Sequence, residues 1–402
     1  MPLVSKATTT VASDDPNALL RLWRNKEARS VIIQVFTLAL LFAFLTFIIN
    51  NAVHNLAQLG KTFSFTFMLE PAGYDINQRL IEYTSRDNHI RAMFVGILNT
   101  ALVAGCGIML ATILGFIFGV LRLSKNWLIN RFVYCFIEFT RNVPILLHIL
   151  LIHGLIVHIM PVPRNAWDVG EAMFLTNRGV IIPKPLFENG FIWTGLASVA
   201  AVAFAWSFRR WAKKVQDATG KIYPVFLVSL AAIIGLPALV FFISGAPLSW
   251  EIPALKSFNF KGGLVMRSEF LALWLALSFY TSAYIAEIVR SGILAVHWGQ
   301  SEAAYAIGIK PNRTLQLVVI PQALRVIIPP LTSQYLNLTK NSSLAIAIGY
   351  MDIVATIGGI SLMQTGKEME SMIIVLSIYL SFSLVISSFM NWYNKKIKLV
   401  ER

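Results

Sequence analysis

The chain has 402 residues, of which 56% are hydrophobic and only 13% are charged, and its mean hydropathy is +0.65. This composition excludes a soluble globular protein and is typical of a chain that crosses a membrane many times. The formal net charge of +14 does not indicate nucleic-acid binding, because the basic residues recur in short clusters between apolar segments and form no single stripe.

Eight apolar segments, each near the length of about 20 residues that a bilayer requires, are predicted to be transmembrane helices. They are residues 31–50, 93–121, 131–160, 191–208, 222–244, 268–296, 322–348 and 370–392. Lys and Arg are more numerous in the loops that share a side with the N-terminus, so the positive-inside rule places both termini in the cytoplasm. The sequence therefore predicts an all-α polytopic membrane protein.

A polar cytoplasmic tail, residues 1–30, precedes an extra N-terminal span, and a long outer loop, residues 51–92, follows it. In that loop Gly60-Lys61-Thr62 matches part of a phosphate-binding loop, but the glycine required five residues earlier is replaced by Asn55. We conclude that the chain encodes no ATPase. Cys106 and Cys135 lie in apolar segments without metal spacing, and we interpret them as small buried hydrophobic residues.

Residues 93–160 are predicted to form the first part of a helical core. Gly115 and Gly119 have the spacing that lets helices approach closely, although in a Gly-rich span such a pair is as often incidental. The segment 131–160 contains residues that are costly in a membrane: Glu138, Arg141, Asn142, Pro144 and His148. Glu138 and Arg141 are three residues apart, so they are expected to pair on one helical face.

Residues 161–262 are interpreted as an insertion. It contains two extra spans of plain apolar character, joined by a basic inner turn from Arg209 to Lys221. Because neither span carries a buried charge, both are expected to be peripheral supports. A pair of added spans also leaves the orientation of the following helices unchanged.

Residues 263–394 are predicted to form the second part of the core, followed by a cytoplasmic tail at 395–402. Glu287 and Arg290 have the spacing of a pair on one helical face. Pro329 and Pro330 should break the span 322–348. Polar residues at membrane depth are tolerated only where they line a cavity or are buried in protein, and this span continues through Asn337, Lys340, Asn341, Ser342 and Ser343.

Between these spans lies a polar, helix-forming loop, residues 300–321. Ser301 is expected to accept hydrogen bonds in the first helical turn, Glu302 suits the positive end of the helix dipole, and Gly308 supplies a left-handed stop. The result would be a helix of two turns, roughly 9 Å long. Lys310 keeps the loop in water, Pro311 begins a second helix, and Pro321 interrupts the helical run.

The spacing of Glu302-Ala303-Ala304, Gly308 and Pro321 resembles the EAA loop of permease subunits in bacterial ATP-binding-cassette importers. The segments 138–147 and 340–344 resemble those of permeases for polar amino acids. Residues 67–76 look like part of the longer, Q-type permease subunits of general L-amino acid importers. The resemblance covers 91–160 and 264–395 and implies a five-helix type I importer core with a cytoplasmic coupling helix.

The resemblance also implies the partners. They would be two cytoplasmic ATP-binding subunits that hold ATP and magnesium, a second permease subunit and a periplasmic solute-binding protein, while this chain binds no cofactor. The partner permease is expected to be a different chain, because this one exceeds a minimal core. The protein would lie among lipids in the inner membrane and carry an L-amino acid.

The resemblance indicates residues for coupling, and the polar groups of the core spans indicate residues for the substrate path. Coupling to the ATPase is assigned to Ser301, Glu302, Ala303, Ala304, Tyr305, Gly308, Lys310, Pro311 and Pro321. The substrate path is assigned to Tyr280, Thr281, Ser282, Asn337, Lys340, Ser342 and Ser343, although these groups could instead satisfy one another. Arg141 and its neighbours are as consistent with a structural role as with substrate contact.

Two other classes of protein remain to be weighed. A stand-alone ion-coupled secondary transporter could use Glu138, Arg141, Glu287 and Lys340, but it does not explain the loop around Glu302, and no repeated half is evident. A membrane enzyme would need a metal, nucleophile or phosphate constellation, and the sequence offers none. We therefore expect a transport subunit and not an enzyme.

Overall fold

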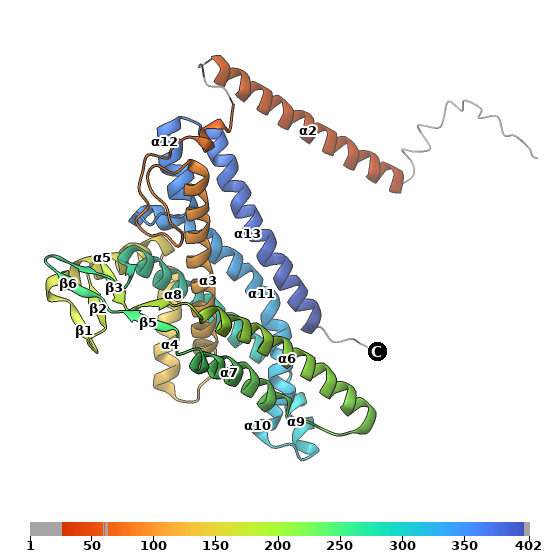
Figure 1. The fold of residues 1–402 in the computed structure, drawn as a ribbon. Helices are drawn as coiled ribbons and strands as arrows, with labels where there is room; N and C mark the ends of the chain where they lie inside the picture. Colours follow the sequence, from red (N-terminus) through yellow and green to blue (C-terminus); the bar gives the residue numbers. More distant parts are fainter. Residues whose placement is uncertain (1–25, 59, 61–62, 398–402) are drawn as a thin grey trace, which may run out of the picture.

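The computed structural model describes residues 26–58, 60 and 63–397 (Figure 1). The first 25 residues of the predicted tail, Lys61 and Thr62 of the outer loop, and residues 398–402 lie outside this part of the chain. Within it, seven helices are long and apolar enough to cross a membrane, or eight if one bent pair counts as a span. The predicted all-α polytopic fold is confirmed.

The long helices are α2 (Lys26–Gln58), α3 (His89–Leu121), α4 (Trp127–Asn142), α5 (Ile145–Ile159), α6 (Phe191–Thr219), α7 (Val225–Ile243), α8 (Ser268–Leu294), α11 (Ile320–Asn341) and α13 (Glu368–Ile397). The shorter ones are α9 (Trp298–Ala306), α10 (Pro311–Thr314) and α12 (Leu362–Thr365). Short 3₁₀-helices and π-helices are η1 (Thr66–Leu69), η2 (Pro163–Asn165), η3 (Leu315–Val319), η4 (Ser342–Ile348) and η5 (Val354–Ser361).

Helix α8 is the centre of the bundle and contacts α3, α4, α5 and α11. Its closest neighbour is α3, because Gly115 faces Ile285 and Gly119 faces Val289 with no room for a β carbon at either glycine. Small residues at this spacing let two backbones approach closely. The glycine pair therefore has a packing role and is not incidental.

The segment 131–160, predicted to be one continuous helix, is divided between two helices. Helices α4 and α5 meet at an angle of 109° at Val143 and Pro144. Proline disfavours the helical conformation of the residue before it, and Val143 is extended, with φ −103° and ψ 132°. Pro144 itself precedes the first turn of α5, where its missing N–H is not needed.

The predicted helix breaks at prolines in the second core segment are wrong. Pro329 and Pro330 lie inside α11, and the helix changes to a 3₁₀ turn only at Ser342. Pro321 lies in the first turn of α11, directly after the π-helix η3, so it does not interrupt the helical run either. Packing of α11 against α8 and α13 holds the backbone despite the missing donors.

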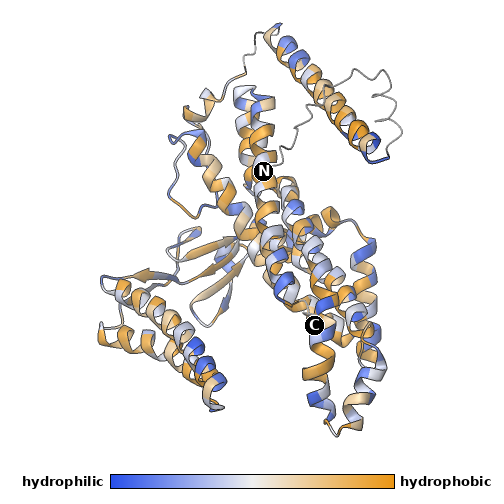
Figure 2. Ribbon diagram, turned by 90° about the vertical axis from the view of Figure 1, so that its right-hand side faces the viewer, coloured by the Kyte–Doolittle hydropathy of each residue, from blue (hydrophilic) through white to orange (hydrophobic). Residues whose placement is uncertain are grey.

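Helices α2, α6 and α7 stand apart from this bundle (Figure 2). Helices α6 and α7 mainly contact each other, as expected for peripheral spans. However, α6 continues to Thr219, so most of the basic stretch that starts at Arg209 is helical, and the turn is limited to residues 220–224. Likewise α2 is longer than the predicted span 31–50 at both ends.

The insertion also contains short strands that the sequence analysis missed. They are β1 (Trp167–Val169), β2 (Met173–Thr176), β3 (Gly179–Ile182), β4 (Lys184–Phe187), β5 (Leu248–Glu251), β6 (Ala254–Lys256), β7 (Asn259–Lys261) and β8 (Leu264–Arg267). Strands β1, β2, β3 and β8 form one antiparallel sheet in that order. Strand β4 pairs with β5 across the two helices α6 and α7, and β6 and β7 form a hairpin; both pairs are antiparallel. In the larger sheet Ile182 lies opposite Leu264. The two arms of the insertion are therefore joined where they leave the bundle.

The loop between α2 and α3 folds onto the α12 end of the bundle. Tyr83 donates to the Tyr74 carbonyl (2.8 Å), and the Tyr74 hydroxyl lies 3.0 Å from Ser361 Oγ. Burial raises the pKa of both tyrosines, so both hydroxyls stay protonated and able to donate. Ser64 donates its N–H to Glu370 on α13 (2.8 Å). This outer loop is thus an ordered part of the fold.

Candidate functional site

Helix α9 begins earlier than the sequence analysis predicted. Its N-cap is His297, whose Nδ1 accepts the N–H of Gly299 (3.1 Å). Ser301 is therefore the fourth helical residue and buried, and not a first-turn cap. Glu302 also lies beyond the first turn, so the helix dipole does not explain its place. With nine residues the helix is about 14 Å long, and not the predicted 9 Å.

The C-terminal stop of α9 is as predicted. Gly308 has a φ of +81°, which favours glycine. Its N–H donates to the Tyr305 carbonyl (2.9 Å), and the N–H of Ile309 donates to the Ala304 carbonyl (3.0 Å). This pair of bonds is a Schellman motif, which satisfies the last carbonyls of the helix and fixes the direction in which the chain leaves.

One face of α9 is buried and the other is free. Ser301 and Ala304 are turned inward, whereas Glu302, Ala303 and Ala306 are exposed. The exposed face continues into Ile307, which is 76% exposed. A helix that shows such a face at one end of a bundle is available to a partner protein.

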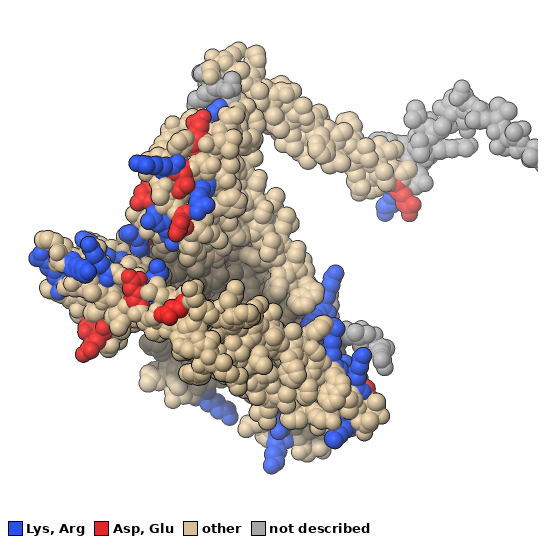
Figure 3. Space-filling model, in the orientation of Figure 1, with Lys and Arg blue, Asp and Glu red and all other residues tan. Residues whose placement is uncertain are grey.

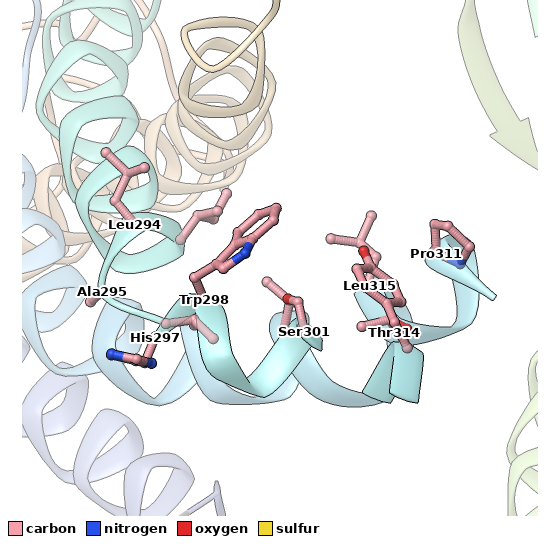
Figure 4. A pocket seen from close by; sticks show the side chains of 12 residues that line it. Leu294, Ala295, His297, Trp298, Ser301, Pro311, Thr314 and Leu315 are labelled. Carbon is pink, nitrogen blue, oxygen red and sulfur yellow. The ribbon is translucent and has the colours of Figure 1, made fainter. Parts of the chain in front are cut away.

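The buried side of α9 borders a cavity of about 690 Å³, shown in Figure 4. Trp298 and Leu315 point to the same side of it in that view. Its other walls come from the end of α8, from α10 and from η3. With this cavity on its buried side, α9 contacts mainly η3 and α10.

Helix α10 returns the chain to the bundle. Pro311 occupies its first turn, as predicted, and the buried Thr314 donates to the Lys310 carbonyl (3.3 Å). The five-residue π-helix η3 then leads directly into α11. Gln322 of α11 donates to Gln300 of α9 (3.3 Å), a direct link between the two helices.

The connection from α9 to the membrane helices is short on both sides. Helix α8 ends at Leu294, three residues before the cap of α9. Gly292 of α8 packs directly on Ile327 of α11. Arg325 of α11 donates from Nε to the Ile397 carbonyl at the end of α13 (3.2 Å). A displacement of α9 would thus be transmitted to three helices of the core.

The predicted pairing of Glu138 with Arg141 is wrong. Among the described residues, neither forms an ion pair, and Arg141 instead lies over the ring of Tyr284, 5.4 Å from its centroid. Asn142 donates to the Glu138 carbonyl (2.7 Å). The bend at Pro144 explains the difference, because it turns this end of α4 toward α8, where an aromatic face is available. The interpretation of Cys135 as buried is also wrong, since it is exposed on α4.

The prediction for α8 is correct at Glu287 and Arg290. The Arg290 guanidinium donates from Nε to Oε2 of Glu287 (3.1 Å) and from Nη2 to Oε1. This bidentate geometry is the strong form of a charge-assisted bond. The pair is a structural feature of one helical face.

A cluster of aromatic and polar side chains at the bend was missed. The Tyr280 and Tyr284 hydroxyls are 3.1 Å apart, and the His148 ring lies 5.8 Å from that of Tyr280. The Nε2 atom of His148 is buried without a hydrogen-bond partner in the described residues. The sequence indicated His148 as costly in a membrane, but only the bend brings it to α8.

The residues assigned to the substrate path divide into two groups. Thr281, Ser282 and Ser342 are buried, and Ser282 and Ser342 donate to carbonyls of their own helices. Asn337 and Lys340 of α11 are exposed, and Ser343 donates to the Lys340 carbonyl (2.7 Å). Of the seven, Tyr280, Asn337 and Lys340 are the ones whose side chains remain available to a solute.

A second polar network, also missed, holds the chain between α11 and α13. Asn99 of α3 donates to the carbonyls of Gln78 and Met351, both at 2.8 Å. Asp352 accepts the Ala355 N–H (2.8 Å) and the Tyr379 hydroxyl (3.1 Å). These bonds cap η5 and fix the irregular backbone. The sequence does show Asn99 as a polar residue within an apolar span, but it does not indicate which distant residues Asn99 bonds to.

No group of three or more His, Cys, Asp or Glu residues could hold a metal ion in the described part of the chain. The site is defined by its geometry: α9 is a short, capped helix at one end of the bundle, with one exposed face.

The chain is similar to known transport proteins in sequence. Residues 217–399 match the family of binding-protein-dependent transport system inner membrane components. The chain is 48% identical over 374 residues to the general L-amino acid transport system permease protein AapQ of Rhizobium johnstonii, covering 93% of each chain. It is 46% identical over 431 residues to the glutamate/glutamine/aspartate/asparagine transport system permease protein BztB of Rhodobacter capsulatus, covering 98% of this chain and 100% of that one. A crystal structure of an amino acid ABC transporter with histidines superposes with a TM-score of 0.45 at 19% identity, over 77% of this chain and 95% of that one.

Proposed function

Because this chain belongs to the binding-protein-dependent transport system inner membrane components, we propose that its helix α9 couples a cytoplasmic ATPase to the transport of L-amino acids. The chain is a permease subunit of an amino-acid ATP-binding-cassette importer in the inner membrane. It is not itself an enzyme, since ATP is hydrolysed by a separate subunit. These relatives favour the importer over a stand-alone ion-coupled transporter.

The observation that carries the coupling role is the exposed face of α9. Glu302 and Ala303 lie on that face, and Gly308 fixes where it ends. The links from α9 to α8 and α11 would convert a movement of the ATPase into rocking of the core helices. Lys310, Pro311 and Pro321 would serve this role by shaping the return to α11.

The charge distribution supports a cytoplasmic position for α9. Figure 3 shows Lys and Arg with hardly any acidic residue at the lower end of the visible face, whereas Asp and Glu are mixed with basic residues at the upper left. Arg209, Arg210 and Lys213 of α6 and Lys395 of α13 belong to helix ends that reach this side. By the positive-inside rule, this end and both termini would face the cytoplasm.

We assign this chain one half of the translocation pathway. Tyr280, Asn337 and Lys340 would line it, and a second permease subunit, a different chain, would cover the faces that they leave open. An amino-acid zwitterion needs donors for its carboxylate and acceptors for its ammonium group. If these residues are structural only, their Ala variants will change expression but leave the apparent affinity of uptake unaltered.

The coupling role is tested with Glu302→Lys in proteoliposomes that contain the complete importer. We expect less ATPase subunit to copurify, and ATP-dependent uptake to fall at least about tenfold, as for a reversed charge contact. The matched control is Glu188→Lys, a second exposed glutamate, which lies between β4 and α6. Unchanged association and uptake in Glu302→Lys would refute the role.

A further inference from the structure

A polar cavity of about 400 Å³ lies where the four-stranded sheet meets the first turn of α8. Asn177 and Arg178 come from the turn between β2 and β3, Arg267 from the end of β8, and Glu269 from α8 itself. The volume is within the range of about 300–1,000 Å³ that small-molecule sites occupy. Three separate segments thus direct polar groups into one space.

The charged groups in its wall are left without ion-pair partners in the described part of the chain. Arg267 donates only its Nε, to the Asn77 carbonyl (3.1 Å), and its two terminal nitrogens remain available. The Arg178 guanidinium forms no hydrogen bond with the described residues. Glu269 accepts only from Ser268 Oγ (3.2 Å). Arg267 and Glu269 are half-buried and Arg178 is exposed, so all three charged groups can reach a ligand in the cavity. A half-buried charge is stabilised when a group of opposite charge binds to it.

Two buried amide oxygens near the cavity also lack donors. They are Oδ1 of Asn177, which lies in the cavity wall, and Oε1 of Gln78. Gln78 borders a narrow space of about 10 Å³ that also shares Arg267 and Glu269 and leads to Tyr350. Buried polar atoms are normally hydrogen-bonded, and each exception asks for an explanation. A ligand with an ammonium or amide group would supply the missing donors.

We propose that this cavity binds an L-amino acid with a second carboxylate, such as glutamate or aspartate, as an access site ahead of the membrane pathway. The two guanidinium groups match the two carboxylates, and Glu269 with the Asn177 oxygen matches the ammonium group. Such a ligand carries a net charge of −1, and Arg178, Arg267 and Glu269 together carry a net charge of +1. The inference rests on the proposed function, since it places the substrate of the importer.

The position of the cavity fits this role. It lies at the opposite end of α8 from α9, a separation of roughly 40 Å along the helix axis. The narrow space beneath it holds no more than a single water molecule, so the route toward Tyr350 is closed in this structure. Ligand bound at the start of α8 would therefore be held until the core helices move.

The test is equilibrium binding of radiolabelled L-glutamate to the intact permease–ATPase complex in nanodiscs, without solute-binding protein. We expect saturable binding that L-aspartate displaces and L-lysine does not. Arg178→Gln should weaken the affinity about tenfold or more, the size of a charge-assisted bond, and Glu269→Gln should weaken it similarly. Lys184→Gln is the matched control, because Lys184 is exposed on β4 outside the cavity wall.

Several results would overturn the proposal. They are a wild-type complex that binds no glutamate, or Arg178→Gln and Glu269→Gln complexes that bind like the wild type. If Arg178→Gln keeps glutamate binding but loses association with the solute-binding protein, the cavity is a protein contact and the proposal is wrong. ATP-dependent uptake by the wild-type complex distinguishes failure of the proposed function from failure of this site. If the wild type takes up no amino acid, the proposed function is wrong. If the wild type takes up amino acids and the variants bind glutamate as it does, only this site is wrong.

Discussion

Gly292 of α8 and Ile327 of α11 touch so closely that the Ile327 side chain fills the space that a β carbon of residue 292 would need. This contact joins the two helices that flank α9 along the sequence. Any movement of α9 relative to the bundle must therefore carry both helices together or break the contact.

Gly292→Ala is expected to destabilise the protein by about 1–3 kcal/mol, because the new methyl group has no room beside Ile327. Gly105→Ala is the control, since nothing lies within 4 Å of a β carbon at that position and alanine favours the helix. Thermal unfolding in detergent distinguishes the two. Equal shifts in the two variants would mean that the contact has no energetic role.

Gly308→Ala is expected to cost about 1–2 kcal/mol through its left-handed backbone alone, because the space around it is open. If α9 couples ATP hydrolysis to transport, uptake per ATP should fall as well. Gly366→Ala, with a φ of +64° and equally open space after α12, should lose similar stability but keep its coupling ratio. Measuring ATPase activity and uptake in the same proteoliposomes gives that ratio. A similar ratio in both variants would contradict the coupling role.

Asn99→Ala is expected to destabilise the fold by about 1–3 kcal/mol, since the carbonyls of Gln78 and Met351 both lose a donor. The resulting freedom should appear as faster hydrogen exchange in residues 349–361. Asn189→Ala, an exposed loop residue, serves as the control. Exchange rates like those of the wild type would show that other bonds hold this segment.

Asp352 gives the protein a distinct pH dependence. Burial raises the pKa of this carboxyl group, which lies between the spans that end at Ile348 and begin at Glu368, from 3.8 to about 7. The folded protein then binds a proton that the unfolded chain has released, so this contribution to stability is present below about pH 4 and is lost as the pH rises to about 7. Asp352→Asn keeps an oxygen for the Ala355 N–H and should lack the dependence. Parallel unfolding temperatures of the two proteins from pH 4.5 to 7.5 would contradict this.

Much of the fold could be predicted from the length of the apolar segments, because a helix needs that length to cross a membrane. The stop at Gly308 and the pair of Glu287 and Arg290 were also predictable, since both depend on residues a few positions apart. In contrast, the start of α9 depends on a histidine cap, which is an uncommon choice for that position.

The errors concern places where distant parts of the chain decide the outcome. Pro329 and Pro330 should break a helix in isolation, but α11 packs against α8 and α13 and stays continuous. The spacing predicted Glu138 as the partner of Arg141, but Arg141 instead lies over the ring of Tyr284 on another helix. The cavity at Arg178 and Arg267 could not be predicted at all, because the two arginines meet only through pairing of β3 with β8.

The same pairing has an evolutionary consequence. Ile182 of β3 and Leu264 of β8 are paired across the two strands. The chain between them, which contains α6 and α7, therefore begins and ends at nearly the same point. A gene could gain or lose everything between those two positions in a single event, with a tight turn closing the gap. The ancestral transporter would then have needed no rearrangement of its helices to acquire this appendage.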